Sequence, residues 1–528
     1  MIRRPMISGK AAQLLAMAAI IALVALLTLN RLGASDVCGG SEAVMGVFVQ
    51  QMVEHDQLLF PLDNCQVPMY KPPLFHWTSS ALDYLRGENV VTAFNLRLPS
   101  ALYATAGAIL TMFFALNLLG VRGAILSGAI LAGSYQYISQ GRIGLVDMTL
   151  TFFEALSLYA FLWWFLIDTD APAALRHKRR LHYLFATSMG LGVLAKGPVG
   201  AILPAAAMII FLALHKRWQT MRYLFKTGPL VLGAAIASSW YLACLIGQRF
   251  SFLSLQLGSE NFGRFFGTLG AMPAWYYLKP LLLNSIPLSL LVPVAAATAF
   301  GVRIPPTDDS HDSRGHRPAL CARFFATFWL VTVVFFELSA FKRRAYLLPL
   351  WPTSAVLLSW WVLDCVVPRV GTAAYQGMMA ICLLLAVGNL FFLPPYEMRG
   401  CGNPLSLAEM LKWPFESLVG RPYAEGFQAK SFREAAARVD RVVARNQPLY
   451  VFQIEDAIEP LVIYLGRCTP QLHGSLGTAP PGYILTTVPT WTRWKESVPQ
   501  LHSILSAPYG DDGLVLLHDG GGAVPQTR

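Results

Sequence analysis

Long apolar stretches, separated by short polar ones, run through most of this chain. They cover residues 11–29, 98–119, 123–138, 148–167, 182–195, 198–214, 228–246, 276–299, 322–338, 345–362 and 372–393. A helix needs roughly 20 apolar residues to cross the hydrocarbon core of a bilayer. The pattern therefore predicts a polytopic α-helical membrane protein with about 11–13 transmembrane helices, since a stretch can be split or missed.

The first of these stretches is predicted to be a helix that stays in the protein. Residues 11–29 are longer than the apolar core of a typical signal peptide, and no small-x-small cleavage motif follows them cleanly. We expect a retained first helix with a cytoplasmic N-terminus.

Basic side chains gather in every second loop between the apolar stretches. They are Arg176, Lys178, Arg179, Arg180, Lys216, Arg217, Arg222, Lys226, Arg303, Arg314, Arg317 and Arg323. The first loop of the other set, residues 30–97, has seven acidic residues against four basic ones. Because Lys and Arg mark cytoplasmic loops, this loop and the C-terminal part of the chain are predicted to lie outside the cytoplasm.

The chain is predicted to change character after the last apolar stretch, where Pro394 and Pro395 follow it. Residues 1–395 form the predicted transmembrane domain, with a first outer loop at 30–97 and a second large one at 247–275. Residues 396–528 are less apolar and predict a small extracytoplasmic α/β domain. A capping box at 431–434 predicts a helix to about residue 446. Short apolar runs at 449–452, 483–487, 503–505 and 514–517 predict strands, and 520–528 a disordered tail.

Composition agrees with a membrane protein and limits the classes of partner that we expect. Only 13% of residues are charged, against about 25% in soluble proteins. The net charge of +11 is explained by the cytoplasmic loops, so we expect a lipid bilayer and no nucleic acid as partner.

The cysteines leave their pairing open. Cys38 and Cys65 share the first outer loop, and Cys401 and Cys468 share the outer domain. An oxidising compartment allows both pairs to form disulfides, while free thiols remain an alternative, and sequence does not fix connectivity.

Charged residues at the outer ends of the apolar stretches are the candidates for chemistry, because charge near the membrane is costly. They are Glu42, Lys71, Arg142, Asp147, Lys196, Glu260, Arg264 and the run Lys342–Arg344. Each has a simpler explanation: lysine and arginine reach headgroups from helix ends, Asp147 suits a helix cap, and Glu260 with Arg264 suits an intrahelical ion pair. Together, carboxylates with lysines and arginines suit a lipid-phosphate substrate, whose leaving group gains negative charge.

An ordered series of motifs resembles the GT-C type polyprenyl-phosphate-sugar glycosyltransferases, the superfamily of protein mannosyltransferases and lipid A aminoarabinose transferases. The motifs are SEAV (41–44), YKPPLFHW (70–77), RLPSAL (97–102), GRIGLVDMTLTFF (141–153), LAKGPVG (194–200), ENFGRF (260–265), PAWYY (273–277) and LSAFKRRAYLLPLWP (338–352). They follow the family's order over residues 30–360, and the aminoarabinose-transferase branch is the most similar.

The resemblance implies a GT-C fold and an enzyme of the bacterial inner membrane that acts at its outer face. It would move a sugar, aminoarabinose-like or another hexose or pentose, from undecaprenyl or another polyprenyl phosphate to lipid A or another envelope glycan, and we expect a monomer. Glu42, Asp147 and Asp36 would be catalytic carboxylates. Lys71, Arg142, Lys196, Lys342 and Arg343 would bind donor or acceptor phosphates, and Glu260, Arg264 and Tyr346 would line a loop over the cavity.

Two positions differ from the family pattern. Ser41 stands where an aspartate usually precedes Glu42, and Tyr70 where a glutamate linked to a metal site usually precedes the lysine. Tyr70 argues against a metal requirement, and no other cofactor is expected. Without that aspartate, either Glu42 acts as the base for a hydroxyl acceptor, with Asp36 as a substitute, or the acceptor is itself anionic.

Two other functions remain alternatives. One is a transporter or flippase that moves a lipid-linked sugar without chemistry, although no inverted repeat is visible in the sequence. The other is a membrane anchor whose outer domain binds a partner.

Overall fold

Residues 9–37, 40–87, 90–167, 171–268, 270–302, 313–398, 432–454, 459–472, 474, 476, 480–507 and 513–519 are described by this computed structural model. The chain forms two compact units. We call the first the helical unit; it comprises Met1–Asn30, Tyr70–Phe75 and Pro99–Leu390. We call the second the mixed unit; it comprises Arg31–Met69, His76–Leu98 and Phe391–Arg528.

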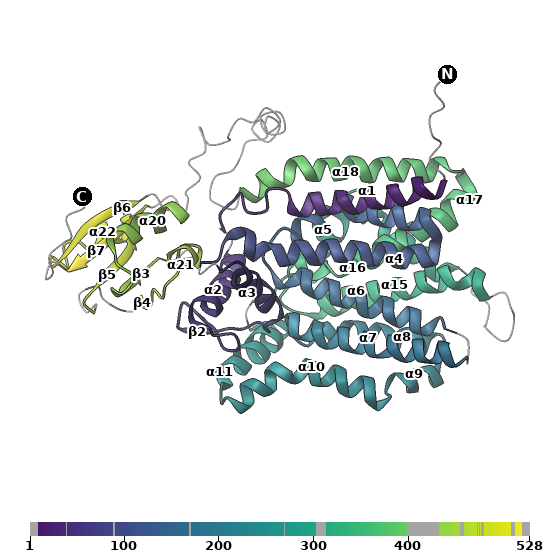
Figure 1. Ribbon diagram of the computed structural model, residues 1–528, viewed down its shortest axis with the longest axis horizontal. Coiled ribbons are helices and arrows are strands. Elements are labelled where there is room, and N and C mark those ends of the chain that lie inside the picture. The colour runs from purple at the N-terminus through teal and green to yellow at the C-terminus, as the bar shows by residue number, and fades with distance from the viewer. Residues whose placement is uncertain are drawn as a thin grey trace, which may run out of the picture. The chain divides into compact units, whose positions relative to one another are not determined.

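The helical unit is built almost wholly of helices (Figure 1). In chain order they are α1 (Gly9–Leu29), α4 (Ala93–Gly133, which begins in the mixed unit), α5 (Tyr135–Gln140), α6 (Val146–Phe165), α7 (Pro172–Lys196), α8 (Val199–Leu214), α9 (Trp218–Leu224), α10 (Thr227–Ile246), α11 (Phe250–Leu253), the π-helix η1 (Ser254–Gly263), α12 (Arg264–Phe266), α13 (Leu278–Leu283), α14 (Leu288–Gly301), α15 (Ser313–Leu338), the 3₁₀ turn η2 (Arg344–Leu347), α16 (Leu350–Trp360), the π-helix η3 (Trp361–Val366), α17 (Val367–Val370) and α18 (Ala373–Met398). The eleven predicted apolar stretches all lie largely in these helices.

Seven helical segments of the described chain are long and apolar enough to cross a membrane. They are Lys10–Leu29, Ala93–Gly133, Val146–Phe165, Gly228–Ile246, His316–Leu338, Leu350–Val370 and Ala373–Phe391. Helices α8 and α14 are also apolar but shorter. The predicted polytopic helical membrane protein is therefore confirmed.

Helix α4 joins two of the predicted stretches. Its 41 residues would extend about 60 Å as one straight helix at 1.5 Å per residue, twice the thickness of a hydrocarbon core. Gly120 interrupts it with φ 73° and ψ −171°, a conformation that glycine adopts without the steric cost of a Cβ. The kink therefore divides α4 into a segment long enough to cross a bilayer, residues 93–119, and a shorter segment, residues 121–133. It falls between the separate predicted stretches 98–119 and 123–138.

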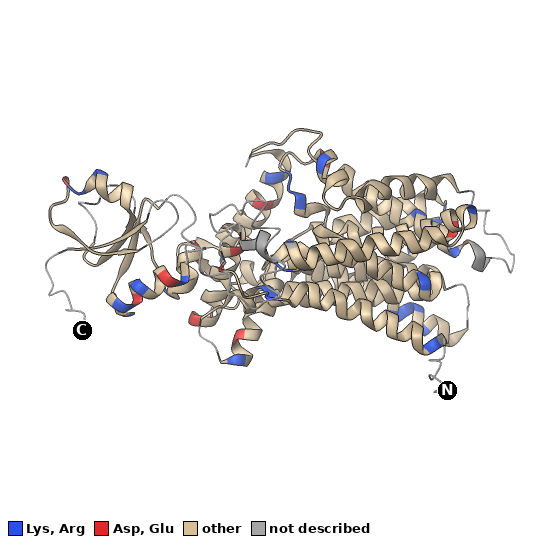
Figure 2. Ribbon diagram, turned by 90° about the horizontal axis from the view of Figure 1, so that it is seen from above, with Lys and Arg blue, Asp and Glu red and all other residues tan. Residues whose placement is uncertain are grey.

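Glycines let the neighbouring helices α7, α8 and α10 pack closely. A Cβ on Gly200 would lie 2.2 Å from the backbone of Gly192, and one on Gly190 would lie 2.6 Å from the carbonyl oxygen of Gly233. Small residues at such contacts are typical of helix pairs in membranes. Figure 2 shows that Lys, Arg, Asp and Glu lie mainly at the ends of the bundle's helices, so the close packing holds helix ends that carry charge in fixed positions.

The mixed unit contains a five-stranded sheet and short helices. Its elements are α2 (Gly40–His55), β1 (Leu62–Asp63), β2 (Val67–Pro68), most of α3 (Leu74–Arg86), α20 (Phe432–Val442), β3 (Leu449–Phe452), α21 (Glu459–Leu465), β4 (Gln471–Leu472), β5 (Tyr483–Thr487), α22 (Val488–Trp494), β6 (Leu501–Ala507) and β7 (Leu514–Asp519). The strand order is β4-β3-β5-β7-β6. Strand β3 is parallel to β4 and β5, and β7 is antiparallel to β5 and β6. The predicted α/β character of the C-terminal part is confirmed.

The four predicted strand runs fall on β3, β5, β6 and β7, while β4 was not predicted because it has only two residues. The predicted helix is α20, which ends at Val442, and its capping residue Ser431 lies outside the described residues. Leu449, Leu485 and Leu516 form the core of this sheet together with Val439 and Leu461 from the helices.

The first predicted outer loop groups with the C-terminal sheet rather than with the helical unit. Helix α2 packs against α21, and a Cβ on Gly46 would lie 2.6 Å from Ile463. The Asn64 side chain donates to the carbonyl of Thr469 (2.6 Å) and accepts from its backbone N–H (2.8 Å). Segments more than 400 residues apart in sequence thus form one folded unit.

A disulfide joins Cys65 to Cys468. The sequence left the pairing open, and the structure decides it: a cysteine of the first outer loop bonds a cysteine of the C-terminal part, because α2 and α21 pack together. Cys38 and Cys401 lie outside the described residues.

Removal of this disulfide by Cys65→Ser is expected to lower the stability of the mixed unit by about 2–4 kcal/mol, because the crosslink closes a very long loop. Peptide mass spectrometry without reduction should find residues 65 and 468 linked in the wild-type protein, and thermal unfolding should report the loss. Cys244→Ser, at a buried free thiol, is the control. Equal stability of the two variants would contradict the crosslink's role.

Candidate functional site

Asp147 and Lys196 form an ion pair between the ends of two adjacent helices. Asp147 lies in the first turn of α6, and Lys196 ends α7. The Lys196 ammonium donates to Asp147 Oδ1 at 2.5 Å, and the two side chains are 12% and 11% exposed. A carboxylate at a helix N-terminus and an ammonium at a C-terminus both complement the helix dipoles, so each residue type matches its position.

Gly197 fixes the turn that presents Lys196. It has φ 111° and ψ −167° as α7 ends, and Pro198 then leads into α8. Residues with a Cβ rarely adopt this conformation. The Lys-Gly-Pro sequence therefore directs the chain sharply out of one helix and into the next, with the lysine at the corner.

Lys71 and Arg264 share a second carboxylate, that of Glu260. The Lys71 ammonium pairs with Glu260 Oε2, and Arg264 Nη2 donates to Glu260 Oε1 at 2.7 Å. Glu260 belongs to η1, and Arg264 follows directly in α12. A π-helical segment is rare and is frequent at functional sites. Pro72 and Pro73 stiffen the chain after Lys71, and the ring of Tyr70 lies 5.3 Å from its ammonium.

Tyr346 connects the two ion pairs. Its hydroxyl accepts a hydrogen bond from Arg264 Nη1 (3.2 Å), and its ring centroid lies 4.5 Å from the Lys196 ammonium, a cation–π geometry. The backbone of Ala340 and Phe341 donates to the carbonyls of Phe265 and Arg264, which fastens the loop before Tyr346 to α12. The positive charge of Arg343 also acts on Asp147.

We call this set the charge cluster; its members are Lys71, Asp147, Lys196, Glu260, Arg264, Arg343 and Tyr346. Basic side chains outnumber the carboxylates in it, so it offers a partly buried, positively charged surface. Such a surface can bind phosphate, with lysines as point charges and arginines as planar donors. The structure therefore brings together most of the predicted phosphate-binding and cavity-loop residues.

Burial changes the proton affinity of Lys71. Loss of hydration lowers the pKa of this lysine to about 8, and the nearby positive charges of Arg264 and Lys196 act in the same direction. The Glu260 carboxylate opposes them. Because desolvation outweighs the ion pair, Lys71 changes charge within a range of pH at which a membrane protein can be studied.

Two predicted phosphate ligands have structural partners instead. Arg142 is buried and donates to the Leu27 carbonyl (2.7 Å), one of the carbonyls in the last turn of α1 that has no partner within the helix. Lys342 is also buried, donates to the Ser339 carbonyl (2.8 Å), and lies 3.7 Å from Glu337. The Arg142 guanidinium and the Lys342 ammonium therefore each bind a backbone carbonyl near the site.

The predicted carboxylates of the first outer loop lie in the mixed unit. Both oxygens of Glu42 accept from Arg97 (2.8 and 2.9 Å), and both side chains are buried. Arg97 also binds the carbonyls of Leu32 and Ser35. The Asp36 carboxylate lies 3.6 Å from the Arg433 guanidinium. Arg97 begins the RLPSAL motif, but the sequence did not indicate that it binds Glu42, because the two residues are 55 positions apart.

Among the described residues, His55, Cys65 and Cys468 are grouped closely enough to hold a metal ion. The two sulfurs are joined in the disulfide, so they do not serve as thiolate ligands in this form.

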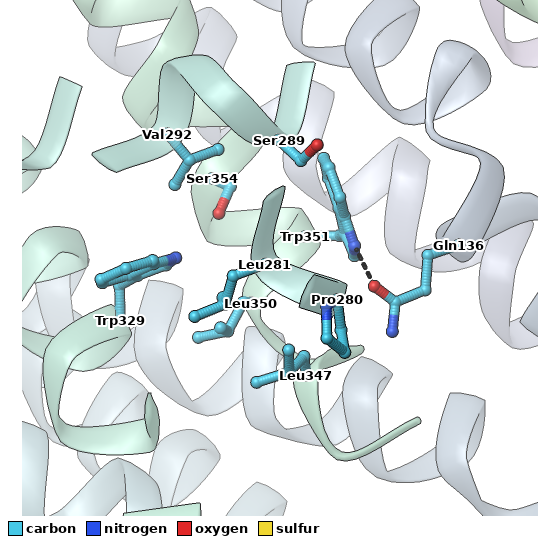
Figure 3. Close-up of a pocket in the computed structure, with 10 residues that line it drawn as sticks. All are labelled: Gln136, Pro280, Leu281, Ser289, Val292, Trp329, Leu347, Leu350, Trp351 and Ser354. Atoms are coloured by element: carbon cyan, nitrogen blue, oxygen red, sulfur yellow. Dashed lines mark hydrogen bonds between the residues drawn. The ribbon is translucent and has the colours of Figure 1, made fainter. Parts of the chain in front are cut away.

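A small cavity is lined by Gln136 of α5, Leu347 of η2, Trp351 of α16 and apolar or hydroxyl side chains of neighbouring helices (Figure 3). Its volume, about 20 Å³, is enough for one water molecule. The Gln136 carboxamide at its edge donates to the Arg344 carbonyl (2.7 Å) and accepts from Trp351 Nε1 (3.0 Å). Gln136 of α5 therefore connects the backbone at Arg344 to Trp351 of α16. No pattern in the sequence indicates this connection.

Comparison with known proteins places the fold and these motifs in context. Residues 49–247 match the family described as dolichyl-phosphate-mannose-protein mannosyltransferase. The undecaprenyl phosphate-alpha-4-amino-4-deoxy-L-arabinose arabinosyl transferase of Pseudomonas paraeruginosa is 27% identical over 285 residues, which are 53% of this chain and 47% of that protein. Its namesake in Edwardsiella ictaluri is 25% identical over 298 residues, 55% and 49% of the two chains. The chain spans about half the length of the curated relatives it matches.

Solved structures show the same fold. ArnT from Cupriavidus metallidurans, bound to undecaprenyl phosphate, has a TM-score of 0.72 at 17% identity, with 96% of this chain and 98% of that chain covered. The oligosaccharyltransferase AglB from Archaeoglobus fulgidus has a TM-score of 0.51 at 11% identity, with 93% and 71% covered. These findings confirm the predicted resemblance: the protein has a GT-C fold and is similar in sequence to polyprenyl-phosphate-sugar glycosyltransferases.

Affinity of the charge cluster for a lipid phosphate is expected to fall as pH rises through about 8, the pKa of Lys71. Above that pH the amine is neutral and no longer attracts the phosphate, and the loss of a hydrogen bond between charged groups corresponds to roughly tenfold or more in Kd. Titration of the purified protein between about pH 6.5 and 9.5 measures it. Lys71→Arg, which stays charged, should keep its affinity over that range. A parallel decline in both proteins would mean that another group is titrating.

Proposed function

We propose that this protein is an integral-membrane glycosyltransferase. It takes a sugar from a polyprenyl phosphate and transfers it to an acceptor at the outer face of the bacterial inner membrane, such as lipid A or another envelope glycan. In this proposal the N-terminus is cytoplasmic, the C-terminal sheet is extracytoplasmic, and the protein acts as a monomer. Two observations support the proposal. Relatives of this chain are named as transferases that use undecaprenyl phosphate-linked aminoarabinose, and basic residues gather in every second loop between the apolar stretches.

The charge cluster is the observation that carries this proposal. Its residues come from five separate places in the chain, near 71, 147, 196, 260 and 343. Folding brings them together beside the adjoining ends of α6 and α7, where unneeded charge would be costly. A lipid with an anionic head presents its phosphate at that depth while its chain stays in the bilayer.

The chemistry follows from where charge develops. During transfer, the bond between the anomeric carbon and the phosphate oxygen breaks, and its electron pair stays on the polyprenyl phosphate. An acceptor oxygen forms the new bond to the same carbon. Lys71, Arg264 and Lys196 stabilise the growing negative charge on the leaving phosphate, since fixed cations in a partly dry site do this best. Glu260 and Asp147 hold these cations in place before the substrate binds.

The acceptor is proposed to be anionic. A hydroxyl acceptor must lose a proton to a base, whereas an ionised phosphate acceptor needs none. Both oxygens of Glu42 are engaged by Arg97 within the mixed unit, which favours an anchoring role for this residue over that of a base. This supports a lipid phosphate, such as one on lipid A, as the group that is modified.

A transporter for a lipid-linked sugar is the competing function, because it would bind the same headgroup. Purified protein in vesicles separates the two. Transfer of labelled sugar from undecaprenyl phosphate to an acceptor supports the enzyme, and movement of the intact lipid without transfer supports the transporter.

Lys196→Ala is expected to reduce sugar transfer about 100-fold or more, because it removes a cation from the leaving phosphate and leaves the Asp147 carboxylate unpaired near it. Initial rates with labelled donor measure the effect. Lys279→Ala removes an exposed lysine of α13 outside the cluster and should keep the wild-type rate. Equal rates for the two variants would exclude Lys196 from the mechanism.

Glu42→Gln is expected to retain transfer within about threefold, since an anionic acceptor needs no general base, and a base contributes roughly 100-fold or more. Thermal unfolding should be measured alongside, because the substitution weakens the contact with Arg97. Loss of more than 100-fold in rate by a variant of normal stability and donor affinity would instead identify Glu42 as the base and a hydroxyl as the acceptor.

A further inference from the structure

Gln256 is a buried polar residue beside the charge cluster. It lies in η1 and is 0% exposed. Among the described residues, neither its Oε1 nor its Nε2 makes a hydrogen bond of full geometry, and the Tyr241 hydroxyl is its polar neighbour. Buried carboxamides in native proteins almost always have partners, because water is lost without compensation when they do not. The position of Gln256 therefore needs an explanation beyond packing.

The π-helical geometry of η1 directs Gln256 toward the charge cluster. Hydrogen bonds in a π-helix run from residue i to i+5, so residues four to five apart lie on nearly the same face. Gln256 and Glu260 are four residues apart, and Arg264 follows after four more. The carboxamide thus shares a face with two members of the cluster.

Contacts with the Lys196 turn place the carboxamide next to a proposed phosphate ligand. A Cβ on Gly197 would lie 2.6 Å from Gln256 Nε2 and 3.3 Å from the side-chain amide atoms of Asn261. Asn261 Nδ2 donates to the Gln256 carbonyl at 2.5 Å, which fixes the turn of η1 that faces Gly197. The absence of a side chain at Gly197 allows this approach.

Tyr241 adds a second polar group at the same place. It belongs to α10, and its hydroxyl lies near the Gln256 side chain. The hydroxyl is buried within hydrogen-bonding reach of the Gln256 carboxamide, but within the described part of the chain it makes no hydrogen bond of full geometry. Two elements, η1 and α10, therefore direct neutral polar atoms to a point beside Lys196.

We propose that Gln256 and Tyr241 form a subsite that binds a hydroxyl or amino group of the sugar being transferred. The proposal rests on the function proposed above. The donor has an anionic phosphate bonded directly to a neutral polar ring, and the protein offers cations directly beside neutral carboxamide and phenol groups. A carboxamide and a phenol both donate and accept hydrogen bonds, which matches sugar hydroxyls better than it matches phosphate.

The test compares donor lipids with and without a sugar. Binding of undecaprenyl phosphate is measured beside a panel in which the same lipid carries a pentose, a hexose or a 4-amino-4-deoxypentose. We expect the wild-type protein to bind at least one member of the panel about fivefold or more tighter than undecaprenyl phosphate, as hydrogen bonds to the ring would add affinity.

Gln256→Leu and Tyr241→Phe keep the side-chain size and remove the hydrogen-bonding atoms. Each is expected to abolish most of the preference for the sugar-bearing lipid and to leave the Kd for undecaprenyl phosphate within twofold of wild type. Thermal stability should be unchanged or higher, because an unpaired buried group is removed. Gly258→Ala is the control on η1, since its Cβ would meet no atom closer than Ser254 Oγ at 4.0 Å.

Equal weakening of both kinds of lipid by Gln256→Leu would overturn the proposal and show that the residue only positions Lys196. A wild-type protein that binds every panel member no tighter than undecaprenyl phosphate would also overturn it while leaving the phosphate site intact. Failure to bind undecaprenyl phosphate at all would overturn the proposed function together with this subsite.

Discussion

Cations of the charge cluster can gather beside the membrane only because carboxylates lie among them. Lys71, Lys196 and Arg264 would repel one another in a partly dry site, and each would lose hydration. Glu260 lies between Lys71 and Arg264, and Asp147 binds Lys196. The two carboxylates thus make the assembly possible, and they leave the positive excess that a phosphate requires. Tyr346 joins the two halves through its hydroxyl and its ring.

Helix ends provide the positions for these charges. Asp147 begins α6 and Lys196 ends α7, while glycine contacts hold α7 against α8 and α10. Gly197 has two roles: its backbone conformation turns the chain, and its lack of a side chain leaves room for Gln256. Glycines therefore serve two purposes around α7: some let the helices pack closely, and Gly197 shapes the turn at the end of the helix.

Several predicted site residues have partners in the backbone or in buried side chains outside the cluster. Arg142 and Lys342 bind backbone carbonyls, and Glu42 is held by Arg97. Their residue types alone could not separate these roles from substrate binding, since a buried arginine that satisfies a carbonyl and one that binds a phosphate have the same sequence signal. What distinguishes them is the partner, and the partner lies tens to hundreds of residues away along the chain.

The sequence by itself determined the class of fold. Apolar length and charge placement follow directly from the cost of burying charge in lipid, so the apolar helices could be predicted. Short apolar runs predicted four of the five strands of the C-terminal sheet. It also identified Lys71, Asp147, Lys196, Glu260 and Arg264 as candidates, because charges at the ends of apolar helices are rare. Only the tertiary structure decided which charges meet, that Cys65 bonds Cys468, and that Gln256 lies against Gly197. Those facts depend on long-range packing and on the unusual turn of a π-helix, and neither has a local pattern in the sequence.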